Sequence, residues 1–483
     1  MNKVILLMVL SLSILLTLSC QNAVNDTTNN TPNVGGEDTD NAESIPEDPY
    51  EKFKDSVGEH NFNGEEFKIQ VFDNANNNLT VDVETETGDP YNDAMYRRNR
   101  DIEERFNVVI KQIITSDDGL AKTKSTIIAG DTESFDIFLA RCPNALSVWQ
   151  EGLAYSYDDI PYIDLSKPYW IQSANKTLTL KGNQYVAIGD FNINAYFLSH
   201  TIIFNKGMIG NFNLDNPYNL VNNEKWTFDK MEEMMKVVIN DVNGDGIMDD
   251  NDRYGYLANP KEVLPSFWIA ADTFSVGKDS DDIPYLAMGS EKFITAFDKT
   301  FNILWDSGAY YKVAGGPDIP ENAIKMFGNN QSLFMDMTFI ILHKIRGMET
   351  DFGIIPYPKI NEAQNDYVSR IEYYMTFNVP VITLQLERAG IMLEVLNSYS
   401  ATSIIPVFYD NALKAKAARD EESEKMIDLI LRTLVVDIGD TTLCDKIRDG
   451  FVAKMFETND RNLTSKLAST ETIIQNFIEK IPQ

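Results

Sequence analysis

One short stretch of the sequence has side chains spaced as ligands for a hard cation. Between residues 241 and 252, oxygen-bearing side chains occupy the first, third, fifth, ninth and twelfth positions, and Gly246 occupies the sixth, where a sharp turn is needed. A divalent cation would relieve the repulsion among carboxylates packed this closely. The predicted ligands are Asp241, Asn243, Asp245, Asp249 and Asp252 through their side chains and Ile247 through its backbone carbonyl. We therefore expect a structural Ca²⁺ ion here, and a solvated acidic turn is the alternative.

The loop resembles the calcium loops of EF-hands and dockerins. Asp252 stands at the twelfth position, where EF-hands carry Glu; in this it resembles dockerins, and the final ligand is shorter. No histidine lies nearby, so the ion would hold a loop in place and would not catalyse a reaction.

Motifs of covalent and metal-assisted catalysis are absent from the sequence. The three histidines, His60, His200 and His343, lie in unrelated contexts. There is no Gly-x-Ser-x-Gly, His-Glu-x-x-His or phosphate-cradling loop. We therefore expect that the protein is not an enzyme.

The N-terminus predicts export. Lys3 precedes an apolar and hydroxyl-bearing run that ends at Ser19 and Cys20, and this run is short for a membrane-spanning helix. Residues 1–19 are therefore a predicted signal peptide. The segment LTLS before Cys20 resembles the lipobox of bacterial lipoproteins, with Thr17 where Leu is usual. This resemblance implies acylation of Cys20 and a lipid anchor on the extracytoplasmic face of the cell membrane. An ordinary signal peptide with an incidental cysteine is the alternative.

Composition limits the possible partners. Residues 20–60 are rich in Asn, Thr, Asp, Glu and Pro, which predicts a disordered tether behind the anchor. The chain has 73 acidic and 42 basic residues, a net charge of −31, so nucleic acid is excluded as a partner. Besides Cys20 only Cys142 and Cys444 remain, and we expect two buried free thiols, with a single disulfide as the alternative.

Hydrophobic periodicity then gives the elements that must position any site. Alternating or apolar runs predict strands at 67–72, 108–114, 135–139, 184–188, 201–204, 254–258 and 353–356. Spacings of three, four and seven predict helices at 93–112, 125–129, 228–240, 291–305 and 389–398. Strands that alternate with helices indicate an α/β fold, and the last eighty residues are predicted to be mostly helical.

Several segments, in this order and spacing, resemble family 1 extracellular solute-binding proteins, the maltose- and oligosaccharide-binding type that feeds ABC importers. The segments are NDAMYRRN at 92–99, FDI at 135–137, PYIDLSKPYW at 161–170, FNK at 204–206, KWTFD at 225–229, the acidic loop at 241, FGIIPYPK at 352–359 and RDEES at 419–423. The resemblance spans most of residues 61–440.

The resemblance implies a two-lobe periplasmic-binding-protein-like fold of type II with a hinge between the lobes. Residues 61–197 plus 360–400 would form lobe 1, and residues 198–359 plus 401–483 would form lobe 2. The hinges would lie near 193–201 and 356–360.

The implied function is a monomeric binding protein that holds a sugar or oligosaccharide between the lobes and delivers it to ABC transporter permease subunits. Two alternatives stay open: a surface lipoprotein that captures glycans for sensing or adhesion, and a surface glycan-degrading enzyme that uses paired carboxylates.

Sugar sites combine aromatic platforms with polar donors and acceptors, which selects candidate ligand-binding residues. Arg141 and Asn144 follow a predicted strand, where α/β sheets bind ligands. Trp170 and Trp268 lie in segments that resemble those near the cleft of the family, although packing in the core explains a tryptophan as well. The residues added by resemblance are Asp73, Asn74, Tyr196, Asp336 and Phe339, the last at a position where related binders carry a stacking Trp.

Overall fold

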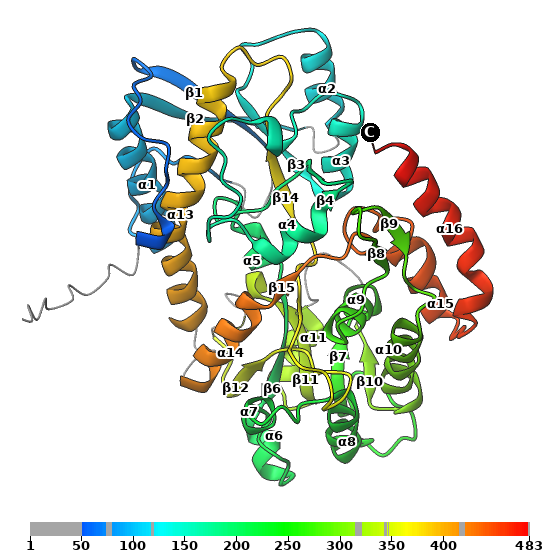
Figure 1. Cartoon of the computed structure of the whole chain (residues 1–483). Coiled ribbons are helices and arrows are strands. Elements are labelled where there is room, and N and C mark those ends of the chain that lie inside the picture. The colour runs from blue at the N-terminus through cyan, green and yellow to red at the C-terminus, as the bar shows by residue number, and fades with distance from the viewer. Residues whose placement is uncertain are drawn as a thin grey trace, which may run out of the picture. The chain divides into compact units, whose positions relative to one another are not determined.

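Two β-sheets organise the residues that the structure describes (Figure 1). The computed structural model describes residues 51–481 except 74–79, 117–119, 314–320, 342–344, 346 and 415–420. The predicted signal peptide, most of the predicted tether and Asn74 therefore lie outside the described residues. Residues 49–483 form one compact unit.

The first sheet has four strands in the order β14-β3-β1-β2. Strands β1 (Glu65–Phe72), β2 (Val108–Thr115) and β3 (Ile137–Arg141) are parallel, and β14 (Met375–Asn378) joins β3 antiparallel. Strand β1 is central, with Phe67 and Ile69 fully buried, whereas Ile114 on the edge strand β2 is exposed. The three parallel strands were predicted within a few residues, because their β-branched and aromatic runs fit a buried sheet.

A helix follows each of the three parallel strands of this sheet. Helix α1 (Pro90–Phe106) begins at Asp89, whose side chain accepts hydrogen bonds from the backbone N–H groups of Tyr91 and Asn92. It ends because Asn107 adopts the left-handed conformation with φ of 47°, so the predicted helix over 93–112 was too long. Helices α2 (Ala121–Ile128) and α3 (Cys142–Gln150) follow β2 and β3.

The second sheet has five strands in the order β10-β7-β11-β6-β12. Its strands are β6 (His200–Asn205), β7 (Tyr254–Ala258), β10 (Tyr310–Lys312), β11 (Ser332–Thr338) and β12 (Phe352–Ile355). Strand β6 runs antiparallel to both of its neighbours, β11 and β12, and β7 lies parallel to β11 and β10. Four of the five strands are buried along their whole length, which indicates cover on both faces.

Helices cover this second sheet. Helix α8 (Phe228–Val238) packs against β7 and β11, and α14 (Glu421–Arg432) packs against β12. Helix α9 (Pro260–Ala270) directly follows β7 and is capped by the Asn259 side chain. The remaining helices of the region are α6 (Lys206–Asn211), α7 (Pro217–Asn222), α10 (Glu291–Phe301), α11 (Glu321–Gly328), α15 (Ala453–Glu457) and α16 (Leu463–Glu479). The C-terminal part is helix-rich, as predicted.

Short elements complete the described structure. They are α4 (Gln172–Leu178), α5 (Asn194–Phe197), β4 (Thr179–Leu180), β5 (Asn183–Gln184), β8 (Val276–Lys278), β9 (Pro284–Leu286), β13 (Ser369–Arg370), β15 (Leu434–Val435) and short 3-10 or π segments at Glu51–Phe53, Tyr157–Asp159, Asn302–Asp306, Phe339–Ile341 and Arg448–Val452. The strand predicted over 184–188 is reduced to the end of a two-residue strand, because residues 185–188 pair with no other strand.

Two segments connect the first sheet with the second, and both contribute residues to the site. The first passage leads through α5 to Ser199, which bridges to Ile371, and into β6. The second runs through residues 369–374 into β14, since Lys359 still pairs with Thr227 at the start of α8. The predicted second hinge at 356–360 therefore lies beside the second sheet, upstream of the passage. The lobe boundaries proposed from the sequence stay a prediction.

Helix α13 (Leu386–Lys414) forms the third connection between the two sheets. It packs along α1 beside the first sheet and continues toward α14 beside the second (Figure 1). By length and composition alone this helix could span a membrane, but 67% of its most apolar window is buried. Its residues Ile391, Met392 and Leu396 belong to the core, as expected of a core helix in a folded domain.

Cys142 and Cys444 are both buried free thiols in this structure, as predicted.

Candidate ligand-binding pocket

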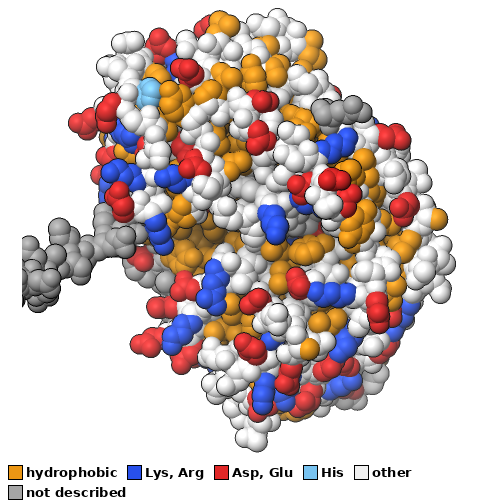
Figure 2. Space-filling view, in the orientation of Figure 1, with side chains coloured by type: hydrophobic (Ala, Val, Ile, Leu, Met, Phe, Trp, Pro, Cys, Tyr) orange, Lys and Arg blue, Asp and Glu red, His pale blue; other side chains and the backbone are white. Residues whose placement is uncertain are grey.

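A cavity of about 720 Å³ is lined by residues from both sheets and from the passages between them. The first sheet contributes Arg141, the last residue of β3, and the second contributes the start of β6, the end of β7 and the middle of β11. The polar lining residues are Arg141, His200, Asn259, Lys261, Glu262, Lys312, Asp336, Thr338, Glu372, Tyr373, Arg448 and Glu457. Figure 2 shows acidic and basic side chains mixed on the face drawn, which is hollowed across its middle.

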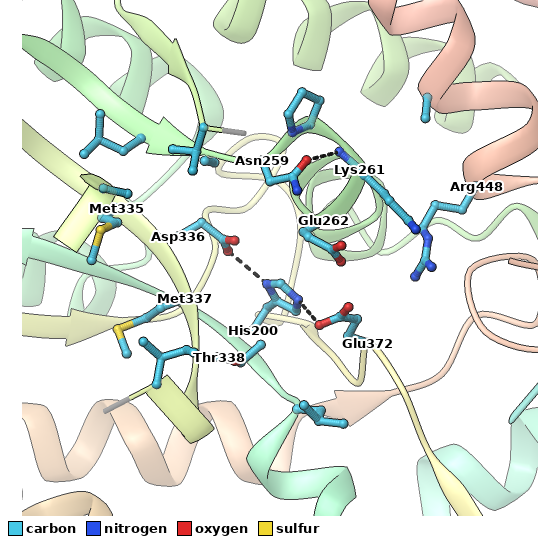
Figure 3. Close-up of a pocket in the computed structure, with 18 of the residues that line it drawn as sticks. His200, Asn259, Lys261, Glu262, Met335, Asp336, Met337, Thr338, Glu372 and Arg448 are labelled. Atoms are coloured by element: carbon cyan, nitrogen blue, oxygen red, sulfur yellow. Dashed lines mark hydrogen bonds and ion pairs between the residues drawn. The ribbon is translucent and has the colours of Figure 1, made fainter. Parts of the chain in front are cut away.

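Local sequence explains how several of these side chains reach the cavity. Strand β7 ends at Ala258, and Asn259 then caps α9 by accepting a hydrogen bond from the Lys261 backbone N–H at 3.1 Å. The first turn of α9 therefore places Lys261 and Glu262 beside the C-terminal end of β7, where they line the cavity (Figure 3). On β11, Asp336 and Thr338 share one face of the strand because side chains alternate.

The imidazole of His200 lies between two carboxylates (Figure 3). Its Nδ1 atom is 2.9 Å from Asp336 Oδ1, and its Nε2 atom is 2.9 Å from Glu372 Oε2. Burial opposes a charge on His200, but the carboxylates of Asp336 and Glu372 outweigh it and raise the pKa of His200 to about 9. The imidazole is therefore positively charged at neutral pH.

Glu262 and Glu372 form a buried pair of carboxyl groups beside this imidazole. Burial and the nearby charge of Glu372 raise the pKa of Glu262 above its ordinary value. Burial also acts against ionisation of Glu372, but hydrogen bonds from His200 and Glu262 hold its pKa well below the usual range. In the absence of a cation, Glu262 therefore keeps its proton and Glu372 carries the negative charge.

A buried ionic network lies beside the pocket and includes the lining residue Arg448. Arg370 on β13 makes two bonds to Asp440, from Nε to Oδ2 at 2.6 Å and from Nη2 to Oδ1 at 2.9 Å. Arg448 donates to the same carboxylate at 3.4 Å and to Asp449 at 2.8 Å. The two guanidinium groups are thus matched by the carboxylates of Asp440 and Asp449.

Two of the residues predicted from the sequence line the pocket, Arg141 and Asp336. The guanidinium carbon of Arg141 lies 4.5 Å from the ring centre of Phe72. Asp336 accepts a hydrogen bond from the Tyr357 hydroxyl in addition to its contact with His200.

Apart from Asn74, which lies outside the described residues, the structure places the other predicted ligand-binding residues outside the pocket lining. Trp170 is 2% exposed and donates to Glu394 at 3.1 Å, and Trp268 is 3% exposed and donates to Asp437 at 2.8 Å. The remaining predicted residues lie as follows: Asp73 is exposed at the end of β1, Asn144 is half-buried on α3, the hydroxyl of Tyr196 donates to Asp190, and Phe339 is buried against Phe408. A role in ligand binding for these residues stays a prediction.

Sequence reasoning missed His200, Glu262 and Glu372. The rule that selected Arg141 at a strand end also applies to residues 259–262, which follow the predicted strand 254–258. His200 lay inside the predicted first hinge, where it was not singled out. No sequence signal marked Glu372, because the second passage was expected upstream of it.

The predicted calcium loop closes between Asn240 and Arg253, which pair as an isolated bridge. The Asp241 carboxylate accepts from the backbone N–H groups of Gly244 at 2.7 Å and Gly246 at 2.8 Å. Gly246 has a φ of 79°, which matches the sharp turn expected at the sixth position. Among the described residues, the acidic and histidine side chains whose ligand atoms lie within 4.8 Å of one another are His200, Glu262 and Glu372, and the loop carboxylates do not converge in this way.

Comparison with known proteins identifies the fold. No protein-family model and no curated protein sequence matches the chain. The cyclic α-maltosyl-1,6-maltose binding protein from Arthrobacter globiformis is 13% identical with a TM-score of 0.57, over 86% of this chain and 98% of that one. A cyclo/maltodextrin-binding protein solved with maltotetraose is 12% identical with a TM-score of 0.56, over 86% and 98% of the two chains. The GacH receptor of Streptomyces glaucescens is 11% identical with a TM-score of 0.53, over 85% and 99%.

These likenesses extend over nearly the whole length of each solved protein and over 85–86% of this chain. The chain therefore has the two-lobed α/β fold of the maltose-binding-protein-like periplasmic binding proteins, with a helix-rich C-terminus.

Proposed function

We propose that this protein is the substrate-binding component of an ABC importer, which holds a sugar or oligosaccharide in the pocket and delivers it to the permease. The observation that supports this most is a cavity of about 720 Å³ that is lined from both sheets by polar and apolar side chains, in a fold shared with maltodextrin-binding proteins. Closure of the lobes about their passages would enclose the ligand.

The chemistry of the lining suits a carbohydrate. Asn259 and Thr338 offer neutral donors and acceptors, while Arg141, Lys312 and Glu457 add charged groups that hydrogen-bond strongly to hydroxyls. Tyr373 supplies an aromatic ring for the apolar face of a sugar. The solved relatives include one complex with maltotetraose and one with acarbose, which directs the first ligands to test.

A binding experiment tests the proposal. The purified chain in detergent is titrated calorimetrically with monosaccharides and malto-oligosaccharides, and its unfolding is followed with each. A ligand at a hundredfold excess over its Kd should stabilise the protein by ~2.7 kcal/mol. Arg141→Ala should weaken binding at least about tenfold, since it removes a charged donor from the cavity.

The control is Arg97→Ala, because Arg97 lies on α1 and pairs with Glu86 at the surface, away from the cavity. Equal loss of binding in both variants, or no binding of any saccharide, would contradict the proposal. Release of new reducing ends during incubation would instead favour the glycan-degrading alternative. Unchanged saccharide uptake in cells that lack this protein would favour glycan capture for sensing or adhesion.

We also propose a structural Ca²⁺ ion in the loop 241–252, held by the predicted ligands. Each oxygen of the Asp241 carboxylate accepts one backbone hydrogen bond and keeps a second lone pair for a cation. Addition of Ca²⁺ to chelator-treated protein should raise its Tm, and Asp241→Asn combined with Asp245→Asn should abolish that rise. The assignment fails if the Tm of the parent chain does not respond to Ca²⁺.

Finally, we propose that the mature chain starts at an acylated Cys20 and is anchored at the extracytoplasmic face of the membrane. The support is the sequence of the export segment and the polar stretch that follows it. A tether of this composition would let the binding protein reach the permease while it stays at the same surface.

A further inference from the structure

One imidazole and two carboxylates converge on the wall of the pocket from three separate parts of the chain. His200 begins β6, Glu262 lies in the first turn of α9, and Glu372 lies in the second passage between the sheets. Their ligand atoms all lie within 4.8 Å of one another. Figure 3 shows the three side chains directed toward one another at the pocket.

The imidazole of His200 is oriented as it would be in a metal ligand. Asp336 Oδ1 lies 2.9 Å from Nδ1, and Asp336 is itself fixed by the hydroxyl of Tyr357. A carboxylate behind one ring nitrogen sets the tautomer and leaves the other nitrogen for the metal. In His200 that other nitrogen, Nε2, faces Glu372 at 2.9 Å.

Glu262 provides an independent reason to place a cation here. Its Oε2 atom is buried and accepts no hydrogen bond from another described residue, so the carboxyl proton that Glu262 directs to Glu372 is the link between the two groups. If Glu262 loses this proton, it becomes a buried acceptor without a donor and is repelled by the carboxylate of Glu372. A divalent cation would satisfy the free oxygen and offset the repulsion together.

The other charges nearby do not already fill this role. Lys261 pairs with Asp449 at 2.9 Å, Arg448 is shared by Asp440 and Asp449, and Arg370 is held by Asp440. These cations are therefore balanced by carboxylates outside the cluster. Among the described residues, the imidazole of His200 is the group that lies between the carboxylates of Asp336 and Glu372.

We propose that His200 Nε2, Glu262 and Glu372 bind a divalent transition metal ion of the Zn²⁺ type at the wall of the pocket. One nitrogen and two carboxylate oxygens form a ligand set that Zn²⁺ accepts at about 2.0–2.2 Å, whereas Ca²⁺ and Mg²⁺ prefer oxygen alone. Atoms within 4.8 Å of one another reach that geometry by small side-chain rotations. Three protein ligands leave a coordination position open toward the cavity, where an oxygen of a bound molecule can complete the shell.

The test is a calorimetric titration of the full chain in detergent with ZnCl₂ alone, after removal of metals with a chelator and with excess Ca²⁺ present. Excess Ca²⁺ occupies the acidic loop, so that this loop does not contribute to the signal. We expect one Zn²⁺ per chain, and crystals soaked in Zn²⁺ should show anomalous scattering beside His200 Nε2.

Isosteric variants identify the ligands. Glu262→Gln and Glu372→Gln should each weaken Zn²⁺ binding by at least about tenfold, because the amide is a poor ligand. Glu457→Gln is the matched control, since Glu457 lines the same cavity but is not part of the cluster, and it should bind Zn²⁺ as the parent does. Circular dichroism and the Tm of each metal-free variant check that the fold is retained.

The absence of stoichiometric Zn²⁺ binding to the parent chain would overturn the proposal. Equal Zn²⁺ affinity in the parent and in both folded cluster variants would also overturn it, because the ion would then lie elsewhere. Saccharide binding is measured separately on metal-free protein, so failure of the metal site and failure of the proposed carbohydrate function are distinguishable.

Discussion

At the scale of single residues, buried acids away from the pocket are matched to donors that come from distant parts of the chain. Glu394 on α13 accepts hydrogen bonds from the hydroxyl of Tyr169, from Trp170 Nε1 at 3.1 Å and from the Asp164 backbone N–H at 3.3 Å. Its side chain is 1% exposed, and this burial raises its pKa to about 7. Glu394 is therefore protonated below neutral pH in the folded chain and ionised in the unfolded chain.

Replacement of Glu394 by Gln should change how stability depends on pH. Between the ordinary pKa of Glu, 4.5, and about 7, the folded state holds a proton that the unfolded state releases. The free energy of unfolding of the parent therefore falls as pH rises through this window, by up to ~3 kcal/mol from this group. In Glu394→Gln this part of the slope should be absent, since the amide still accepts from Trp170 and does not titrate.

Urea unfolding at several pH values between 4.5 and 8 measures the effect as the difference between parent and variant. Glu387→Gln is the control, because Glu387 is exposed at the start of the same helix and its replacement should leave the slope unchanged. If the free energy of unfolding of Glu394→Gln depended on pH as that of the parent does, the raised pKa of Glu394 would be contradicted.

At the scale of elements, the edge strand β12 depends on a residue without a side chain. A Cβ at Gly353 would lie 2.2 Å from Tyr218 Oη and 2.4 Å from the ring of Phe204 on β6. Tyr218 is itself fixed to α14, because its hydroxyl lies 2.7 Å from Ser423 Oγ. The close approach of β12, α7 and α14 therefore requires Gly353.

Gly353→Ala should destabilise the protein by about 1–3 kcal/mol, because the added methyl group forces Tyr218 and Phe204 apart. Gly210→Ala on α6 is the matched control: nothing lies within 4 Å of its Cβ position, and alanine favours a helix. Chemical unfolding should show a loss in the first variant and none in the second. Equal stability of Gly353→Ala and the parent would show that the neighbours adjust without cost.

Local sequence patterns predicted some strands correctly and missed others. Strand β7 begins and ends at the predicted residues, because a short apolar run is followed by Asn259 and Pro260, which start a helix. Strand β11 was not predicted as a strand, since its sequence SLFMDMT includes Asp336 in a buried position. That aspartate is stable there only because His200 and Tyr357 supply partners from other elements.

At the scale of the whole molecule, the proposed anchor decides where the binding protein works. Cys20→Ala should remove the site of acylation and release the exported chain from the membrane fraction into the soluble extracytoplasmic fraction. Saccharide and Zn²⁺ affinities should not change, because the pocket lies within the compact unit of residues 49–483.

Cell fractionation and metabolic labelling with a radioactive fatty acid measure this outcome. Cys444→Ala serves as the control, because this cysteine is buried in the folded unit and should not affect labelling. Retention of Cys20→Ala in the membrane fraction would show that another segment holds the chain there.

The sequence by itself determined the α/β class, six of the nine strands in the two main sheets, the helices α1, α2, α8, α10 and α13 in approximate position, and Arg141 at a strand end. These features follow from side-chain periodicity, helix caps and strand-end rules that act over a few residues. The resemblance to binding proteins added the two-lobed fold, which the solved structures confirm.

Only the tertiary structure decided which side chains meet. It paired the indole N–H groups of Trp170 and Trp268 with Glu394 and Asp437, which places both tryptophans in the core, and it brought Glu262 and Glu372 to His200. Such contacts join residues far apart in the chain, and they depend on strand register, on where the chain passes between the sheets and on the partner that each buried charge finds. No local pattern in the sequence encodes those three conditions, so the convergence at the pocket wall is visible only in the folded molecule.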